Sequence, residues 1–263
     1  MSLVFAAITP HSPLLIPAIG KDNLKKLSKT KQALERLEED LYLSHPDTIL
    51  IISSHGHILP DAFSINFCTD YESDLREFGD LTTKLKLKGE VTLPSKIRAA
   101  SKKNGYPAVI VSERALDHGV VVPLFYLTRH LPDTTILPLH FSNLDWKTHL
   151  DFGYLVKDQI MHSNKRVAVI ASGDLSHALT TDAPAGFNPA GAEFDQKIQE
   201  LLSTGNSTGL LRLSPELVNN AAECGLRSFL ILMGILRGVH YNYESYAYES
   251  PFGVGHLTAN LAL

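Results

Sequence analysis

The sequence predicts an α/β fold: a central mixed, mostly parallel twisted sheet covered by helices on both faces. Two observations predict it. β-Branched apolar runs alternate along the chain with segments whose apolar residues repeat at helical spacing. Several of the runs contain hardly any polar residue, which is typical of strands buried on both faces. No Pro/Gly/Ser-rich linker divides the 263 residues, so we expect a single domain over residues 1–263.

The elements follow in chain order. A strand at Leu3–Thr9, a helix at Leu24–Leu41 behind Asp22 as its cap, and a strand at Thr48–Ser53 form a β-α-β beginning. Further buried strands are expected at residues 108–111, 135–139 and 166–171, and further helices at residues 94–103, 123–130, 146–162, 190–202 and 221–236. Pro123 suits the first turn of its helix, and Gly238 could stop the last one.

Two other segments complete the prediction. The tail, Tyr241–Tyr248 and Gly255–Leu261, is expected to return as strands that run antiparallel. Thr69–Gly89 is the most polar and least periodic stretch, so we expect it to form an excursion or lid over one end of the sheet.

Composition excludes several classes of protein. The formal net charge is −4, so the basic surface that binding to nucleic acid needs is missing. Cys68 and Cys224 form no CxxC pair, which argues against a disulfide framework and favours a reducing compartment. The apolar stretch Phe229–Leu236 is too short to cross a bilayer, and no signal peptide is readable. We therefore expect a cytoplasmic protein that binds neither nucleic acid nor membrane.

Histidines follow three of the expected strands. His11 follows Leu3–Thr9, His55 follows Thr48–Ser53, and His177 closes the segment after the strand that ends at Ala171. Ligands bind in the crevice outside the carboxyl ends of parallel strands, so these imidazoles can converge there. Only one of His55 and His57 should point into the crevice, and we favour His55 over His57. A lone histidine is more often a hydrogen-bonded structural residue, and His177 could serve as a metal ligand or as a general acid and base.

Three further residues could contribute to this crevice. His118 precedes Gly119 at a helix start and could lie beside a substrate or cap the helix from a buried turn. Glu223 could complete a metal site or interact with the dipole of the helix that follows it. Cys224 could be a soft ligand or a small buried hydrophobic residue. Two imidazoles and one carboxylate favour Fe(II), with zinc or copper as alternatives.

The motifs of other enzyme classes are missing or lie in the wrong context. The GxSxG match at Gly205–Gly209 follows an expected helix and not a strand, so it forms no nucleophile elbow. The chain has no GxxxxGK[ST] phosphate loop, no GxGxxG after a strand and no HExxH. The sequence therefore does not predict a serine hydrolase, a nucleotide-binding enzyme or a nicotinamide-dependent enzyme.

In the order of its short motifs the chain resembles the class III extradiol ring-cleavage dioxygenases, the group of the protocatechuate 4,5-dioxygenase catalytic subunit, together with the related Memo-like proteins of the AmmeMemoRadiSam system. The resemblance rests on five segments spread over nearly the whole chain: Ile8–His11, Ser53–His55, Leu116–Gly119 with Pro123, Ser172–His177 and Ala222–Gly225.

The resemblance implies that His11, His55 and Glu223 bind Fe(II), that His177 is the acid/base residue, and that His118 touches the oxygens of a small aromatic diol cleaved with O2. It also implies a possible homo-oligomer or small partner subunit. Cys224, in the context Ala-Glu-Cys-Gly-Leu-Arg, is more similar to the Memo-like proteins. This alternative is a metal-binding protein with a redox, accessory or protein-interaction role and no ring cleavage.

Overall fold

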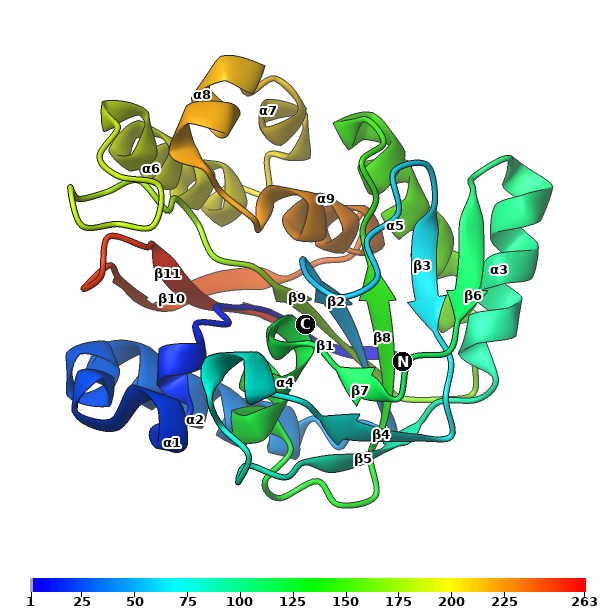
Figure 1. Ribbon diagram of the computed structural model, residues 1–263. Helices are drawn as coiled ribbons and strands as arrows, with labels where there is room; N and C mark the ends of the chain where they lie inside the picture. Colours follow the sequence, from blue (N-terminus) through cyan, green and yellow to red (C-terminus); the bar gives the residue numbers. More distant parts are fainter. Residues whose placement is uncertain (1) are drawn as a thin grey trace.

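One mixed sheet organises the molecule, seen in a computed structural model that describes residues 2–263. The sheet has eleven strands in the described part of the chain, and helices pack against both of its faces, as the sequence predicts. Figure 1 shows helices α6, α8 and α9 on one side of the sheet and α1, α2 and α4 on the other.

Four parallel strands form the centre of the sheet. Their order across the sheet is β1 (Leu3–Thr9), β9 (Val167–Ser172), β2 (Thr48–Ser53) and β8 (Thr135–His140). In the register of these strands Thr9 lies beside Ser172, and Ser53 lies beside His140. All four strands therefore end at the same edge, where the predicted crevice should be.

The remaining strands extend this centre on both sides. On one side β11 (His256–Ala262) pairs antiparallel with β1, and β10 (Asn242–Glu249) pairs antiparallel with β11, which confirms the expected tail. The strands on the other side are β3 (Phe63–Asn66), β4 (Asp70–Ser73), β5 (Lys86–Gly89), β6 (Ala108–Val111) and β7 (Ala115–Leu116). Of these, β3 runs antiparallel to β8 and β5 runs parallel to it, so the sheet is mixed.

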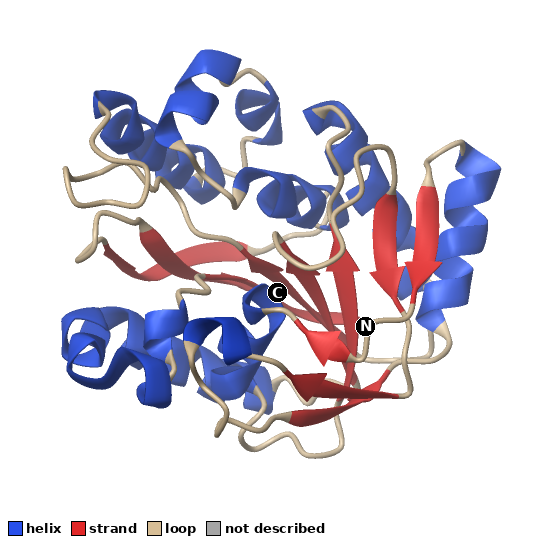
Figure 2. Ribbon diagram, in the orientation of Figure 1, coloured by secondary structure: helices blue, strands red, loops and turns tan. Residues whose placement is uncertain are grey.

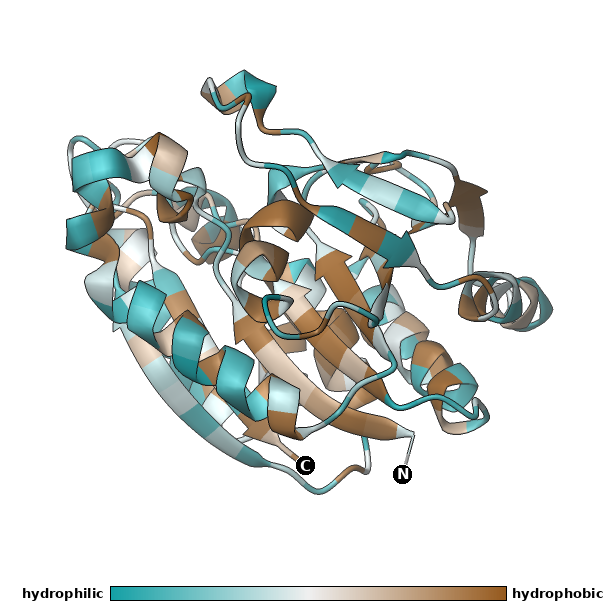
Figure 3. Ribbon diagram, turned by 90° about the horizontal axis from the view of Figure 1, so that it is seen from below, coloured by the Kyte–Doolittle hydropathy of each residue, from teal (hydrophilic) through white to brown (hydrophobic). Residues whose placement is uncertain are grey.

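Two hydrophobic cores hold the helices to the sheet. In β2, Leu50 and Ile52 enter one core, whereas Ile49 and Ile51 enter the other, because successive side chains of a strand point to opposite faces. The helices of the first face are α3 (Leu93–Asn104), α5 (Trp146–Met161), α6 (Pro189–Ser203), α7 (Ser207–Leu211), α8 (Pro215–Ala221) and α9 (Leu226–Ile235). Those of the second face are α1 (Pro17–Gly20), α2 (Ser28–Leu43) and α4 (His118–Leu127). Figures 2 and 3 show this layering and the apolar strands at its centre.

Three helices begin elsewhere than predicted. Helix α9 begins at Leu226 and not at residue 221, because Pro215–Ala221 forms the separate helix α8. The α-helix α2 begins at Ser28 after a 3-10 segment, and Asp22 pairs with Lys25 instead of capping a helix. Helix α4 begins at His118, with Asp117 as its cap, so Pro123 lies inside the helix and not in its first turn. Helix α4 tolerates this proline because of a contact between Ser172 and Gly119 in the candidate metal centre.

The polar segment Thr69–Gly89 is more regular than an excursion. It contributes β4 and β5 to the sheet, and between them the 3-10 turn Arg76–Phe78 reaches His118. The ring centroids of Phe78 and His118 lie 4.9 Å apart. The segment thus covers one side of the edge where the parallel strands end.

Cys68 and Cys224 are both free thiols, in agreement with the expected absence of a disulfide framework. Within residues 2–263 no helix combines the length and the apolar character that crossing a membrane requires.

Helices α5 and α9 approach each other through two glycines. A Cβ atom at Gly153 would lie 2.1 Å from the Ile231 carbonyl oxygen, and one at Gly234 would lie 2.0 Å from the Leu150 carbonyl oxygen. Contacts this short would force the backbones apart, so the two helices depend on the missing side chains.

We therefore expect Gly153→Ala to lower the free energy of unfolding by about 1–3 kcal/mol, the usual cost of overpacking. In an unobstructed helix interior the same change would raise stability by about 1 kcal/mol. Urea denaturation of the two proteins decides the sign. A more stable variant would contradict the close contact between α5 and α9.

Candidate metal centre

His11 lies directly beyond β1, and a chain of hydrogen bonds fixes its ring. Its Nδ1 lies 3.0 Å from the Ser172 hydroxyl, and that hydroxyl donates to the Gly119 carbonyl oxygen at 2.6 Å. Because the carbonyl can only accept, the Ser172 oxygen accepts from the His11 Nδ1–H. The His11 Nε2 atom is therefore the nitrogen that carries the free lone pair, as a metal ligand must.

The position of Pro123 explains why the Gly119 carbonyl is available. In a regular helix the amide of residue 123 would donate to the carbonyl of residue 119, four positions earlier. Proline has no amide hydrogen, and the Ser172 hydroxyl donates to this carbonyl. Pro123 is tolerated inside α4 because the carbonyl that it leaves unpaired has another donor.

His55, beyond β2, faces His11. The two Nε2 atoms lie 3.1 Å apart. Burial lowers the pKa of His11 to about 3 and that of His55 to about 4, so both rings are neutral at neutral pH. Metal–nitrogen bonds of about 2.1 Å leave neighbouring ligand nitrogens about 3 Å apart, so the two Nε2 atoms are spaced to share one ion.

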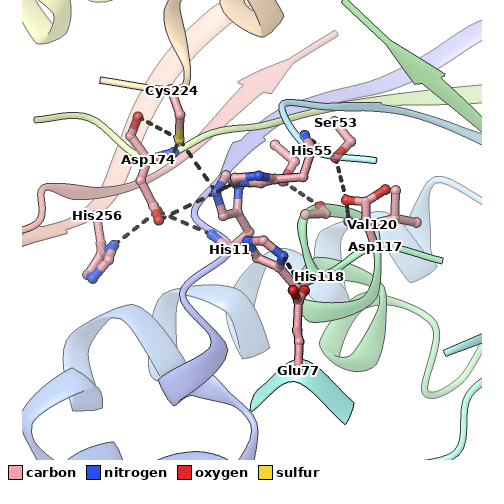
Figure 4. A network of polar contacts seen from close by, with 12 residues as sticks. His11, Ser53, His55, Glu77, Asp117, His118, Val120, Asp174, Cys224 and His256 are labelled. Carbon is pink, nitrogen blue, oxygen red and sulfur yellow. Dashed lines mark hydrogen bonds and ion pairs between the residues drawn. The ribbon is translucent and has the colours of Figure 1, made fainter. Parts of the chain in front are cut away.

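His118, the first residue of α4, is the third imidazole of this group. Its ring centroid lies 4.0 Å from that of His55 and 5.4 Å from that of His11. One ring nitrogen from each of the three histidines lies within 4.8 Å of the others, a spacing that can hold a metal ion. On its other side His118 approaches Glu77, with 3.6 Å between Nδ1 and Oε1, as Figure 4 shows.

A second possible ligand group shares His11 and consists of His11, Asp174 and Cys224. The Cys224 Sγ lies 3.5 Å from the His11 Nε2, and the nearer carboxylate oxygen of Asp174 lies 3.6 Å from it. A Cβ atom at Gly173 would lie 2.3 Å from the Gly225 Cα, so the two loops meet through glycines. Burial raises the pKa of the Cys224 thiol well above its ordinary value.

Asp174 contacts both the backbone of His11 and a further histidine. Its Oδ1 accepts from the His11 amide at 3.2 Å and contacts the His256 Nδ1 at 3.0 Å. His256 is the first residue of β11. It was not predicted as a site residue, although it directly follows Gly255 at the start of an expected strand.

The predicted ligand Glu223 lies in neither group among the described residues. Its Oε2 accepts from the Leu226 amide at 2.6 Å, at the start of α9, which is the structural alternative that the sequence left open. Burial raises the pKa of Glu223 to about 7. The residue before it, Ala222, has a φ of 52°, a conformation that is strained for a residue with a side chain.

His177 and His57 take different places. The His177 amide donates to the Ala221 carbonyl, while its buried Nδ1 has no hydrogen-bond partner in the described structure. A buried ring nitrogen without a partner is available to a ligand. His57 is half-exposed, lies 3.8 Å from Glu113, and belongs to neither group of possible ligands described above.

A cavity of about 630 Å³ lies beside the turn that follows His55 and beside Asp117, the cap of α4. Its lining includes Gly56, Glu77, Asp117 and His140, and its volume is typical of a small-molecule site. Sequence reasoning missed Asp117 and His140, whose side chains pair at 3.2 Å. His140 ends β8 and could have been found by the same strand-end rule that indicated His11 and His55.

The donor set fits a divalent transition metal. Neutral imidazoles, at least one of them with a free Nε2 lone pair, form one group of possible ligands, and a thiol and a carboxylate share His11 in a second group. Fold and site together define an α/β protein with a histidine-rich candidate metal centre at the carboxyl edge of a parallel sheet.

The chain belongs to the family of the catalytic LigB subunit of aromatic ring-opening dioxygenases, whose family model matches residues 5–259. This match confirms the resemblance that the sequence motifs indicated.

The curated relatives vary in length and in name. A protein of Clostridium acetobutylicum with only a locus name is 31% identical over 97% of this chain. The match covers 57% of that relative, so the chain spans little more than half of its length. The 4,5-DOPA dioxygenase extradiol of Mirabilis jalapa is 27% identical, over 69% of this chain and 68% of its own. The 2-aminophenol 1,6-dioxygenase alpha subunit of a Pseudomonas species is 25% identical, over 97% of both chains.

Among solved structures, an uncharacterized protein from Escherichia coli K12 has the same fold. Its TM-score is 0.65 at 16% sequence identity, and the match covers 98% of this chain and 100% of that one. This likeness supports the fold alone.

Replacing Ser172 by alanine should weaken metal binding by about 10–100-fold, because the hydroxyl that sets the tautomer of His11 is lost. The dissociation constant for Co(II), measured by competition with a chromophoric chelator, tests this. Ser101→Ala is the matched control, since Ser101 is also buried and also donates to a backbone carbonyl, that of Ile97 in α3. Equal affinities of Ser172→Ala and Ser101→Ala would contradict the role of Ser172.

Proposed function

We propose that the protein is a non-haem Fe(II)-dependent extradiol-type dioxygenase that opens a catecholic aromatic ring with O2. The observation that carries the proposal is the pair of neutral imidazoles of His11 and His55, with Nε2 atoms 3.1 Å apart. Gly56, the residue directly after His55, lines a cavity of ligand size. Membership of the ring-opening dioxygenase family supports the same reaction class.

In this proposal His11, His55 and Glu223 hold the iron. Two imidazoles and one carboxylate leave positions open for substrate and O2, the arrangement typical of Fe(II) oxygenases. To bind the metal, the Glu223 carboxylate must turn from the Leu226 amide or share one oxygen with it. Bound iron would supply the redox chemistry that joins O2 to the electron-rich ring.

His118 and His177 act on the substrate. His118 lies between the paired imidazoles and Glu77, where it can donate to or accept from a diol oxygen. His177 has a buried Nδ1 without a partner, so this nitrogen can take or return a hydroxyl proton. Both oxygen atoms of O2 enter the product, a muconic semialdehyde-type compound formed by cleavage beside the hydroxyl-bearing carbons.

A second candidate is a metal-binding protein with a redox, accessory or interaction role and no ring cleavage, as in the Memo-like proteins. The specific observation in its favour is Cys224, whose Sγ is 3.5 Å from the His11 Nε2 while Glu223 contacts a backbone amide. A thiolate ligand would favour a softer metal such as zinc or copper.

The ring-opening relatives also motivate a proposal about assembly. One of them is called an alpha subunit. We propose that this chain acts as a homo-oligomer or with a small partner subunit, in the cytoplasm.

The identity of the third ligand separates the two candidates. If the protein is a dioxygenase, Glu223→Ala should lose nearly all bound iron, whereas Cys224→Ala should retain it. Iron content after anaerobic reconstitution with Fe(II) is the measurement, and His11→Ala serves as the positive control for loss. Iron loss in Cys224→Ala alone would leave the site without its carboxylate and favour the second candidate.

Nitric oxide, a stand-in for O2, tests whether one iron binds both reactants. The electron paramagnetic resonance spectrum of the nitrosyl protein should change when a catechol is added.

His177→Ala should keep near-normal iron and the same nitrosyl signal, yet lose ring cleavage in a product-colour assay, because a proton carrier is missing. The exposed His162 provides the control His162→Ala. Loss of iron from His177→Ala would make His177 a ligand.

A further inference from the structure

The hydrogen bonds that fix the candidate metal centre meet at the first turn of α4. Asp117, the cap of this helix, accepts at Oδ1 from the Val120 amide at 3.2 Å and from the Ser53 hydroxyl at 2.7 Å. The Ser53 oxygen accepts in turn from the His55 amide at 3.1 Å. Asp117 therefore connects the turn that carries His55 to the helix that begins with His118.

The other oxygen of Asp117 connects the turn to a third strand. Oδ2 pairs with the His140 Nε2 at 3.2 Å, and the opposite nitrogen of His140 contacts the Ser64 hydroxyl at 3.1 Å. Burial alone would raise the pKa of Asp117, but the hydrogen bonds from His140 and Ser53 outweigh it and lower this pKa to about 2. Asp117 is thus a carboxylate with partners on both oxygens.

Two glycines leave no spare room around this carboxylate. A Cβ atom at Gly119 would lie 2.4 Å from the Ser53 Oγ, and one at Gly56 would lie 2.7 Å from the Asp117 Oδ2. Gly56 also has a φ of 80°. The turn after β2 and the first turn of α4 therefore lie too close together for side chains at these two positions, and Asp117 occupies the contact.

The same turn also reaches His11. Pro123 donates nothing to the Gly119 carbonyl, and the Ser172 hydroxyl that orients His11 donates to it. One helical turn thus holds all three imidazoles: His118 as its own residue, His55 through Asp117 and Ser53, and His11 through Gly119 and Ser172.

We propose that Asp117 and Pro123 are positioning residues for the metal centre: Asp117 sets the place of His55 against His118, and Pro123 frees the Gly119 carbonyl that sets the tautomer of His11. This inference rests on the proposed function, in which His11 and His55 bind a metal. It assigns a function to the beginning of α4, from its cap Asp117 to Pro123.

Asp117→Ala tests the first half. We expect its dissociation constant for Co(II) to rise about 10–100-fold, and Asp117→Asn, which keeps an acceptor for Ser53 and Val120, to recover most of the affinity. The control is Asp145→Ala, because Asp145 caps α5 through the Thr148 amide in the same way but lies on another helix. Asp117→Ala should lose more thermal stability than Asp145→Ala, because it also removes the contacts with Ser53 and His140. Only Asp117→Ala should lose metal affinity.

Pro123→Ala tests the second half, and it should move two quantities in opposite directions. The restored amide can donate to the Gly119 carbonyl, so thermal stability should stay equal or rise. Co(II) affinity should fall about tenfold, since the Ser172 hydroxyl must then share its acceptor with this amide. Pro189→Ala is the control, because Pro189 occupies the first turn of α6, where a proline replaces no helical hydrogen bond.

A measurement without metal separates this inference from the proposed function. Long-range ¹H–¹⁵N correlation spectra of the metal-free protein should show His11 with its proton on Nδ1, and Pro123→Ala should show a mixture of tautomers. If wild-type protein binds no Co(II), the proposed function fails together with this inference. If the wild type binds Co(II) but the variants match their controls in affinity and tautomer, only the positioning roles are overturned.

Discussion

The arrangement of the candidate site depends on the Ser172 hydroxyl, which joins β9 to the first turn of α4. It accepts from His11 and donates to the Gly119 carbonyl, so it fixes the ring of His11 and the distance of α4 from the sheet at once. Without this contact the carbonyl that Pro123 leaves unpaired would be a buried acceptor without a donor, which costs about 1–3 kcal/mol. The same hydroxyl of Ser172 therefore determines both the position of α4 and the tautomer of His11.

Parallel pairing explains why residues distant in sequence meet here. The register places Thr9 beside Ser172 and Ser53 beside His140, so each strand delivers its next few residues to the same edge. The strands are apolar because both faces are covered, and the polar side chains follow where the covering layers end. Burial at this edge keeps His11 and His55 neutral, which is the form that binds metal.

The predictable parts are those that local patterns determine. Apolar runs locate the four central strands, and the residues that follow them locate His11 and His55, because both follow from the periodicity of side chains. Helix α4 could not be placed correctly, since a proline normally indicates a helix start and its tolerance at Pro123 depends on Ser172, 49 positions later. In the sequence Asp117 is only part of an Asp-His-Gly turn. Its contacts with Ser53 and His140 are tertiary, so no local pattern indicates them.

The segment Glu223–Cys224 shows how little separates the two proposed functions. The two residues are neighbours in the chain, yet one side chain bonds the start of α9 and the other lies beside His11. An oxygen donor would favour a harder metal than a sulfur donor at the same pair of imidazoles. Ala222, directly before the two residues, has a φ of 52°, a conformation that is strained for a residue with a side chain. The strand ends place the imidazoles, whereas the loop before α9 carries both of the side chains that the two proposals use as the third donor.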